Sequence, residues 1–281
     1  MSKEDTAGSM GFSVITPSLN QGKFIEKNIQ SVLAQNYPNV EHIVIDGGSS
    51  DETIDVLKRY PHLRWISEPD RGQAHALNKG LRMSRGEIIG WLNADDEYLP
   101  GTFERVARAL DKSGGRWVVM GDVQKTDESG RVLRVLRNDP KKFHHLVRFW
   151  DPNRRTFHQP GVFFYKEILT EVGFLDESLH FAMDYDLWLR IIQIYDFYRI
   201  DAIFAKYRFH ETSKSNLGWD AFMPEWELVS KRYVERLSRR QKTCYSLCLG
   251  AFKRHFGKWL PRSLRRVMGL PKIRSRLKAG R

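Results

Sequence analysis

The sequence predicts an open α/β fold in which strands and amphipathic helices alternate around one sheet. Short apolar, partly β-branched runs recur at 12–16, 42–45 and 87–92, separated by segments with apolar residues at helical spacing. Polar residues follow each run directly, in VITPSLN, IVIDGGSSDET and IIGWLNADDEYLP. Because parallel strand ends line one crevice in such a sheet, these three loops would meet at a ligand site.

The first 120 residues give a regular series of elements. Strands are expected at 12–16, 42–45, 63–67, 87–92 and 117–120, and helices at 24–35, 52–59, 73–83 and 101–110. This alternation favours a single doubly wound domain with right-handed crossovers.

The pattern is looser in the second half of the chain. Turn residues predict a hairpin at 127–130, whereas 141–155 has no expected element. The later elements are a strand at 161–165, a helix at 185–195, a strand at 198–207 and helices beyond 218. With 281 residues, 41% hydrophobic and 28% charged, the chain can bury one good core and a smaller appended unit.

The net charge of +12 is concentrated near the end of the sequence. Residues 236–281 contain fifteen Lys or Arg and no Asp or Glu, which leaves 31 basic and 34 acidic residues before them. A near-neutral body with a strongly basic tail indicates a catalytic part and an anchoring segment. The body carries no nucleic-acid recognition motif, so we expect no nucleic-acid partner.

Hydropathy and cysteine content indicate a cytoplasmic protein. No stretch approaches the eighteen or so apolar residues of a spanning helix, and MSKEDTAGSM lacks the apolar core of a signal peptide. Cys244 and Cys248 are too few for a disulfide framework or a metal cluster, and we interpret them as small apolar residues.

Acidic residues at two expected strand ends suggest the chemistry. Asp46 could accept a hydrogen bond from a nucleobase while the following glycines let the ligand approach, although Asp-Gly also marks a simple turn. Asn93, Asp95 and Asp96 follow a fully apolar strand, where adjacent carboxylates need a neutralising cation. A Mg²⁺ or Mn²⁺ ion would provide it; a solvated turn with a helix cap is the alternative.

Together these segments resemble the family 2 glycosyltransferases, inverting enzymes with the GT-A fold, which implies a Rossmann-like mixed sheet flanked by helices. The resemblance covers roughly residues 12–210, and its further carriers are SEPDRGQAHALNKG and FAMDYDLWLRI. It implies a GT-A catalytic domain at 1–215, with a nucleotide-binding half at about 12–121 and an acceptor-binding half at about 122–215. A basic helical extension would follow at 216–281.

The resemblance also implies a donor pocket for a UDP-sugar. Thr16 and Pro17 match the loop that packs against the nucleoside, and Asp46 with Gly48 matches the turn that reads uracil. The stretch that lines the nucleotide and sugar pocket is matched by Asp70, Arg71, Asn78 and Lys79.

Asn93, Ala94 and Asp95 occupy the three places of the family's DXD motif. Asn93 stands where the first Asp is common, so we expect it to contact ribose or a water, with Asp95 as the principal metal ligand and Asp96 supporting it. His210 matches a histidine near the diphosphate and is expected as a further ligand; a plain surface or core histidine is the alternative.

Asp184 is the expected general base. In FAMDYDLWLRI it matches the second acid of the family's acidic pair, whereas Met183 replaces the first. A carboxylate at a helix start could take the proton from the acceptor hydroxyl; a helix cap is the alternative, and Asp186 is the second candidate base. His158 and Gln159 are expected on the acceptor side.

The tail predicts a membrane contact. Aromatic and aliphatic residues recur at helical spacing between basic residues from 252 to 267, as in helices that lie in an anionic interface. We therefore expect a peripheral protein on the inner face of the cytoplasmic membrane, acting on a glycan or lipid-linked saccharide. A packed helix pair with a solvated basic face is the alternative, and a nucleotidyltransferase or a nucleic-acid-binding protein are the alternative functions.

Overall fold

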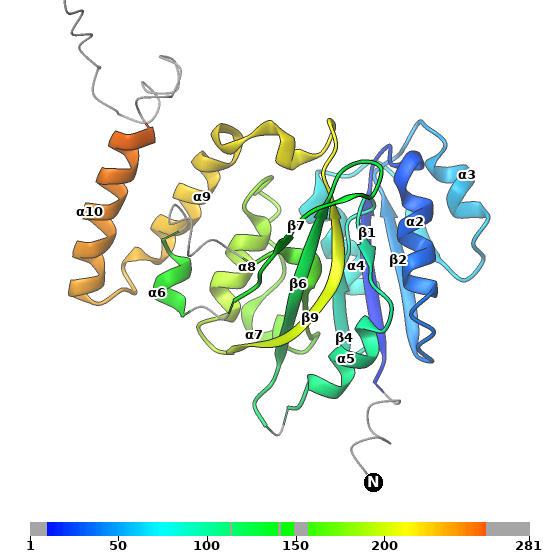
Figure 1. Cartoon of the computed structure of the whole chain (residues 1–281), viewed down its shortest axis with the longest axis horizontal. Helices are drawn as coiled ribbons and strands as arrows, with labels where there is room; N and C mark the ends of the chain where they lie inside the picture. The colour runs from blue at the N-terminus through cyan, green and yellow to red at the C-terminus, as the bar shows by residue number, and fades with distance from the viewer. Residues whose placement is uncertain (1–9, 113, 140–141, 149–156, 257–281) are drawn as a thin grey trace, which may run out of the picture.

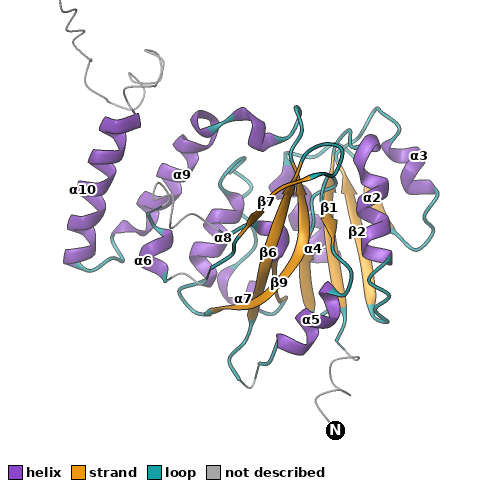
Figure 2. Ribbon diagram, viewed as in Figure 1, coloured by secondary structure: helices purple, strands orange, loops and turns teal. Residues whose placement is uncertain are grey.

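The structure is a computed structural model that describes residues 10–112, 114–139, 142–148 and 157–256. Its centre is one nine-stranded mixed sheet with helices packed on both faces (Figure 1; Figure 2). The strand order is β3-β2-β1-β4-β8-β6-β9-β5, and β7 pairs with β6 outside this path. The predicted α/β fold with a mixed sheet is therefore confirmed.

Four strands form the parallel half of the sheet: β1 (Phe12–Ser18), β2 (Val40–Asp46), β3 (Arg64–Ser67) and β4 (Ile88–Trp91). All four were expected. β1 extends two residues beyond its expected end, and β2 begins two residues earlier and ends one residue later than expected. Their register places Ser18 beside Asp46 and Asp46 beside Ser67. The loops after these strands consequently lie at one edge of the sheet, as the sequence predicted.

The other half of the sheet is largely antiparallel, which corrects the expectation of a doubly wound domain. It contains β5 (Glu97–Tyr98), β6 (Val118–Thr126), β7 (Val132–Leu136), β8 (Val162–Tyr165) and β9 (Phe197–Arg208). β8 runs antiparallel to both β4 and β6, and β7 forms an antiparallel hairpin with β6. The predicted turn at 127–130 closes this hairpin. β5, only two residues long, was not expected.

Successive residues of β2 face opposite layers, because strand side chains alternate. Val44 packs with α2 (Gly22–Leu33) and α3 (Thr53–Lys58), whereas Ile43 and Ile45 pack on the other face with α4 (Gln73–Met83). An apolar cluster around Phe103 of α5 (Thr102–Ala109) covers the centre of the sheet. These helices match the expected ones within two residues.

The second half adds further helices, of which α7 and α9 pack against α8. They are α6 (Phe143–Leu146), α7 (Ile168–Val172), α8 (Met183–Ile191), α9 (Trp219–Val234) and α10 (Arg239–Phe256), with 3₁₀ turns at Gln159–Gly161 and Lys214–Leu217. α9 belongs to the same apolar cluster as α8, and the Trp226 ring stacks on Tyr185 with 5.1 Å between centroids. α10 lies farthest from the sheet in Figure 1.

The predicted membrane segment lies mostly outside the described residues, which end at 256. Within the described ranges, no helix combines the length and apolar character needed to cross a bilayer.

Candidate functional site

Asn28 on α2 connects β1 with the loop that follows β4. Its side-chain amide donates to the carbonyl oxygens of Asn93 (2.8 Å) and Asp96 (3.1 Å). Its Oδ1 lies 3.5 Å from the hydroxyl of Thr16, which lies 2.9 Å from Nε2 of His42. Burial lowers the pKa of His42 to about 3, so this ring is neutral at pH 7. Thr16, predicted to face the nucleoside, is thus buried within the framework of the site.

Asp46 is fully buried beneath the loop that follows β2. Its Oδ2 accepts hydrogen bonds from the backbone N–H groups of Gly48 (3.0 Å) and Ser49 (2.8 Å) and from the Ser67 hydroxyl (2.7 Å). Gly48 has a φ of +85°, a conformation that favours glycine. Pro17 on β1 is also buried. A base could therefore reach Asp46 only if this loop moved, and the role of Asp46 in reading uracil stays a prediction.

Asp70 lies against the same loop from the neighbouring segment. A methyl group at Gly47 would lie 2.7 Å from Asp70 Oδ2, so the absence of a side chain at Gly47 permits this approach. Asp70 Oδ1 accepts a hydrogen bond from the Gly72 N–H at 2.7 Å. Lys79 instead pairs with the exposed Glu68 at 2.6 Å. Asp70 thus lies close to Gly47, the residue after Asp46, whereas Lys79 pairs with Glu68; the donor contacts of Asp70 and Lys79 stay predictions.

Asn78 fixes the loop that leads to α8. Its side chain is buried, donates to the Leu175 carbonyl oxygen (2.9 Å) and to Glu177 (3.0 Å), and accepts from the Leu175 N–H (3.0 Å). Arg71 pairs with the same Glu177 at 2.6 Å. The amide of Asn78 is therefore used to hold two segments together, and its predicted donor contact stays a prediction.

Asn93 links the end of β4 to two other segments. Its Oδ1 accepts from Trp91 Nε1 and from Gln73 Nε2, both at 2.9 Å, and its Nδ2 donates to Gln159 Oε1 at 3.3 Å. The next residue, Ala94, is buried among the side chains of α2 and α3. Gln159, expected on the acceptor side with His158, thus lies directly beside Asn93.

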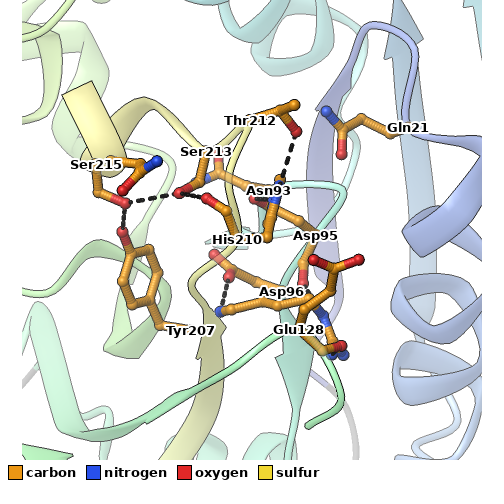
Figure 3. Close-up of polar contacts among 12 residues, drawn as sticks. Gln21, Asn93, Asp95, Asp96, Glu128, Tyr207, His210, Thr212, Ser213 and Ser215 are labelled. Carbon is orange, nitrogen blue, oxygen red and sulfur yellow. Dashed lines mark hydrogen bonds and ion pairs between the residues drawn. The ribbon is translucent and has the colours of Figure 1, made fainter.

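Asp95 and His210 meet although 115 residues separate them in sequence. Asp95 Oδ2 lies 3.0 Å from His210 Nε2, while the Thr212 hydroxyl lies 3.0 Å from His210 Nδ1 (Figure 3). The Phe24 ring packs against the imidazole with 4.5 Å between centroids. His210 is almost fully buried, whereas the Asp95 side chain is 18% exposed. The two predicted metal ligands therefore face each other at the edge of the sheet.

Arg208 lies next to the Asp95–His210 pair and bonds to the backbone of Asp95. Its buried guanidinium donates to the carbonyl oxygens of Asp95 (3.1 Å) and Glu128 (2.7 Å) and to the carboxylate of Glu97. The Arg208 N–H donates to Asp96 Oδ1 at 2.9 Å, and Asp96 Oδ2 has no partner among the described residues. Burial and the nearby charge of Asp95 raise the pKa of Asp96 well above its usual range. Both effects disfavour the charged form of Asp96.

Asp184 lies in the first turn of α8 and is half-buried. Burial raises the pKa of its carboxyl to about 6, against the opposing effects of backbone hydrogen bonds and of Lys214. A carboxylate with this pKa is ionised at neutral pH and can accept a proton. Asp186 is instead buried and bonded to Arg190 (2.9 Å) and Tyr233 (3.1 Å). Only Asp184 of the two candidate bases is thus available for chemistry.

Two residues that the sequence reasoning missed, Gln73 and Lys214, bridge these groups. Lys214 Nζ donates to Gln73 Oε1 (2.8 Å) and to the His180 carbonyl oxygen (3.1 Å), and Gln73 donates in turn to Asn93. Desolvation lowers the pKa of Lys214, whereas nearby carboxylates, Asp184 among them, raise it. The only sequence feature that could have indicated Lys214 is its closeness to the predicted metal ligand His210, in the segment FHETSKS.

Asp95 and His210 are too few to complete a metal site by themselves. Among the described residues, no group of three or more His, Cys, Asp or Glu side chains is arranged to hold a metal ion. A ligand and water would have to supply the remaining positions, as is common for Mg²⁺ bound with phosphates.

Solved structures agree with the fold derived above. S. aureus TarS 1–349 in complex with UDP-GlcNAc superposes with a TM-score of 0.64 at 17% identity, over 93% of this chain and 76% of that one. The mannosyltransferase PcManGT from Pyrobaculum calidifontis, in complex with GDP-Man and Mn²⁺, gives 0.60 at 18% identity, over 93% and 80%. At these identities the likeness shows the fold, and it confirms the GT-A arrangement.

Sequence comparison gives the family. An uncharacterized glycosyltransferase of Rickettsia felis is 29% identical over 231 residues, which cover 76% of this chain and 38% of the relative. This chain therefore spans well under half the length of that relative. The model of glycosyl transferase family 2 matches residues 13–173, more than half of the 281 residues. The chain thus belongs to glycosyl transferase family 2.

Proposed function

We propose that the protein is an inverting glycosyltransferase that moves a hexose or N-acetylhexosamine from a UDP-sugar to a hydroxyl group of a glycan or lipid-linked acceptor. The main support is that two side chains, Gln73 and Lys214, connect the Asp95–His210 pair with Asp184. Gln73 bonds to Asn93 in the loop of Asp95, and Lys214 bonds to Gln73 and interacts electrostatically with Asp184. A ligand at this edge would meet both groups.

The residues present fit a divalent cation. Asp95 and His210 would hold it, because a partly exposed carboxylate faces an imidazole nitrogen at 3.0 Å and both are ordinary ligands of Mn²⁺. The bound ion would stabilise negative charge on the departing diphosphate.

Asp184 supplies the base in this proposal. Its carboxylate takes the proton from the acceptor hydroxyl while that oxygen attacks the anomeric carbon, and the bond from this carbon to the diphosphate oxygen breaks. The nucleoside diphosphate leaves, the proton stays on Asp184, and a single displacement inverts the anomeric centre. The positive charge of Lys214 favours the ionised form of Asp184 that this step needs.

A donor survey tests the proposal. The purified protein is incubated with Mn²⁺, a lipid-linked or oligosaccharide acceptor and either a UDP-sugar or GDP-mannose, and the released nucleoside diphosphate is measured. We expect acceptor-dependent release of UDP and a product of inverted anomeric configuration. Release of GDP alone would refute the choice of nucleotide, and a product of retained configuration would refute the mechanism.

For localisation, we propose a cytoplasmic enzyme held at the inner face of the cytoplasmic membrane by its basic tail. Residues 257–281 contain nine Lys or Arg and no acidic residue. Each basic residue near an anionic surface contributes about 1 kcal/mol to binding. We expect the full chain to sediment with anionic vesicles at low salt and a chain truncated after Phe256 to stay in the supernatant. Equal sedimentation of both would rule out this role of the tail.

A further inference from the structure

The backbone turn before the predicted base is held by a residue of another helix. The Glu225 carboxylate, on α9, accepts hydrogen bonds from three successive N–H groups: His180 (2.9 Å to each oxygen), Phe181 (2.7 Å) and Ala182 (3.0 Å). We propose that Glu225 is a positioning residue for Asp184, which makes α9 a structural part of the active site. This inference rests on the proposed function, because it assigns Glu225 a role in the step that Asp184 performs.

The start of α8 needs such a partner. The N-cap position is occupied by Ala182, which has no side-chain oxygen that could accept a hydrogen bond. Asp184 Oδ1 accepts from the N–H of Tyr185, which lies inside the first turn and not in the segment before the helix. The carboxylate of Glu225 satisfies the N–H groups that precede the helix, and its negative charge is favourable at a helix N-terminus.

Lys214, which also bonds to Gln73, holds the same turn by a second contact. Lys214 Nζ donates to the His180 carbonyl oxygen at 3.1 Å, so His180 is fixed through its N–H by Glu225 and through its carbonyl by Lys214. Lys214 also bonds to Gln73, which bonds to Asn93. An unbroken series of hydrogen bonds therefore runs from the predicted metal loop to α9, with the turn before Asp184 in its middle.

Glu225 is itself well placed by its neighbours on α9. Trp226 is buried, stacks on Tyr185 and donates through Nε1 to the Phe181 carbonyl oxygen at 3.3 Å. Ser230, one turn further, is buried and donates to the Val147 carbonyl oxygen at 2.8 Å. These contacts fix α9 at Trp226 and Ser230, close to Glu225 in sequence, so the carboxylate of Glu225 meets the turn at a defined position.

The test compares Glu225→Ala and Glu225→Gln with Asp220→Asn, a change of an exposed carboxylate earlier on the same helix. Glu225→Ala leaves three N–H groups without their acceptor, so Asp184 should be misplaced and kcat should fall roughly 10- to 100-fold. Donor KM and donor affinity should stay unchanged. Glu225→Gln keeps one acceptor oxygen and should fall in between, and Asp220→Asn should match the wild type.

Hydrogen exchange of the backbone amides at 180–182, measured on the full chain, gives a readout independent of catalysis. We expect faster exchange there in Glu225→Ala and intermediate exchange in Glu225→Gln, which carries the test if Glu225→Ala does not fold. An unchanged kcat despite faster exchange would overturn the positioning role. A lower Tm with proportional loss of donor-binding sites and an unchanged kcat per site would overturn it as well. If the wild-type protein transferred no sugar, the proposed function would fail first, and this role with it.

Discussion

Asp184→Asn is expected to reduce kcat by roughly 10² to 10⁴, the contribution of a general base, while donor affinity stays within twofold. The asparagine side chain has nearly the same shape but cannot take the acceptor proton. The measurement is steady-state transfer together with calorimetric titration of the donor in the presence of Mn²⁺. Asp196→Asn, an exposed change beyond α8, serves as the control and should transfer sugar at the wild-type rate.

The pH profile gives a second test of the same residue. Because burial raises the pKa of Asp184 to about 6, the wild-type kcat should rise as pH increases through 6 and level off above it. The effect on stability has the opposite sign. Because the folded state binds the Asp184 proton more tightly than the unfolded state does, the contribution of Asp184 to the free energy of unfolding decreases as pH rises from about 4 to 6. Asp184→Asn should lack both effects and should not lower Tm at pH 7. Wild-type rates in this variant would assign the base to another group.

Asp95→Ala is expected to remove the metal-dependent part of donor binding. Mutating a group that only orients a metal ligand typically costs 10- to 100-fold in affinity, and loss of a ligand should cost at least roughly as much. Calorimetry with and without Mn²⁺ measures the effect, which should vanish when the metal is left out. His210→Ala should act in the same direction, because its ring faces Asp95 at 3.0 Å.

Glu211→Ala is a matched control, since Glu211 is exposed and adjacent to His210 in sequence. It should retain wild-type affinity with and without Mn²⁺. Equal Mn²⁺-dependent affinities of Asp95→Ala and the wild type would show that Asp95 does not hold the cation.

The spacing of apolar residues along the chain was enough to predict part of the site. The loops after β1, β2 and β4 were placed at one sheet edge because apolar runs ended in polar residues, and α4 was predicted with both of its ends correct. Asp184 was placed near a helix start for the same reason, although α8 begins two residues earlier than expected. The direction of β8 could not be read this way, because a buried apolar run has the same pattern in either orientation.

The sequence by itself determined the α/β alternation, the polar strand ends and the family. The spacing of apolar residues and the order of motifs can both be read along the chain without knowing which distant segments touch. Tertiary structure alone decided which polar atoms are already occupied. Asp46 is enclosed by its own loop, Asn78 bonds to the segment before α8, and Glu225 caps a turn 43 to 45 residues away. Such partners depend on how helices pack across the sheet, since a hydrogen bond needs contact at about 3 Å and sequence spacing does not fix that distance.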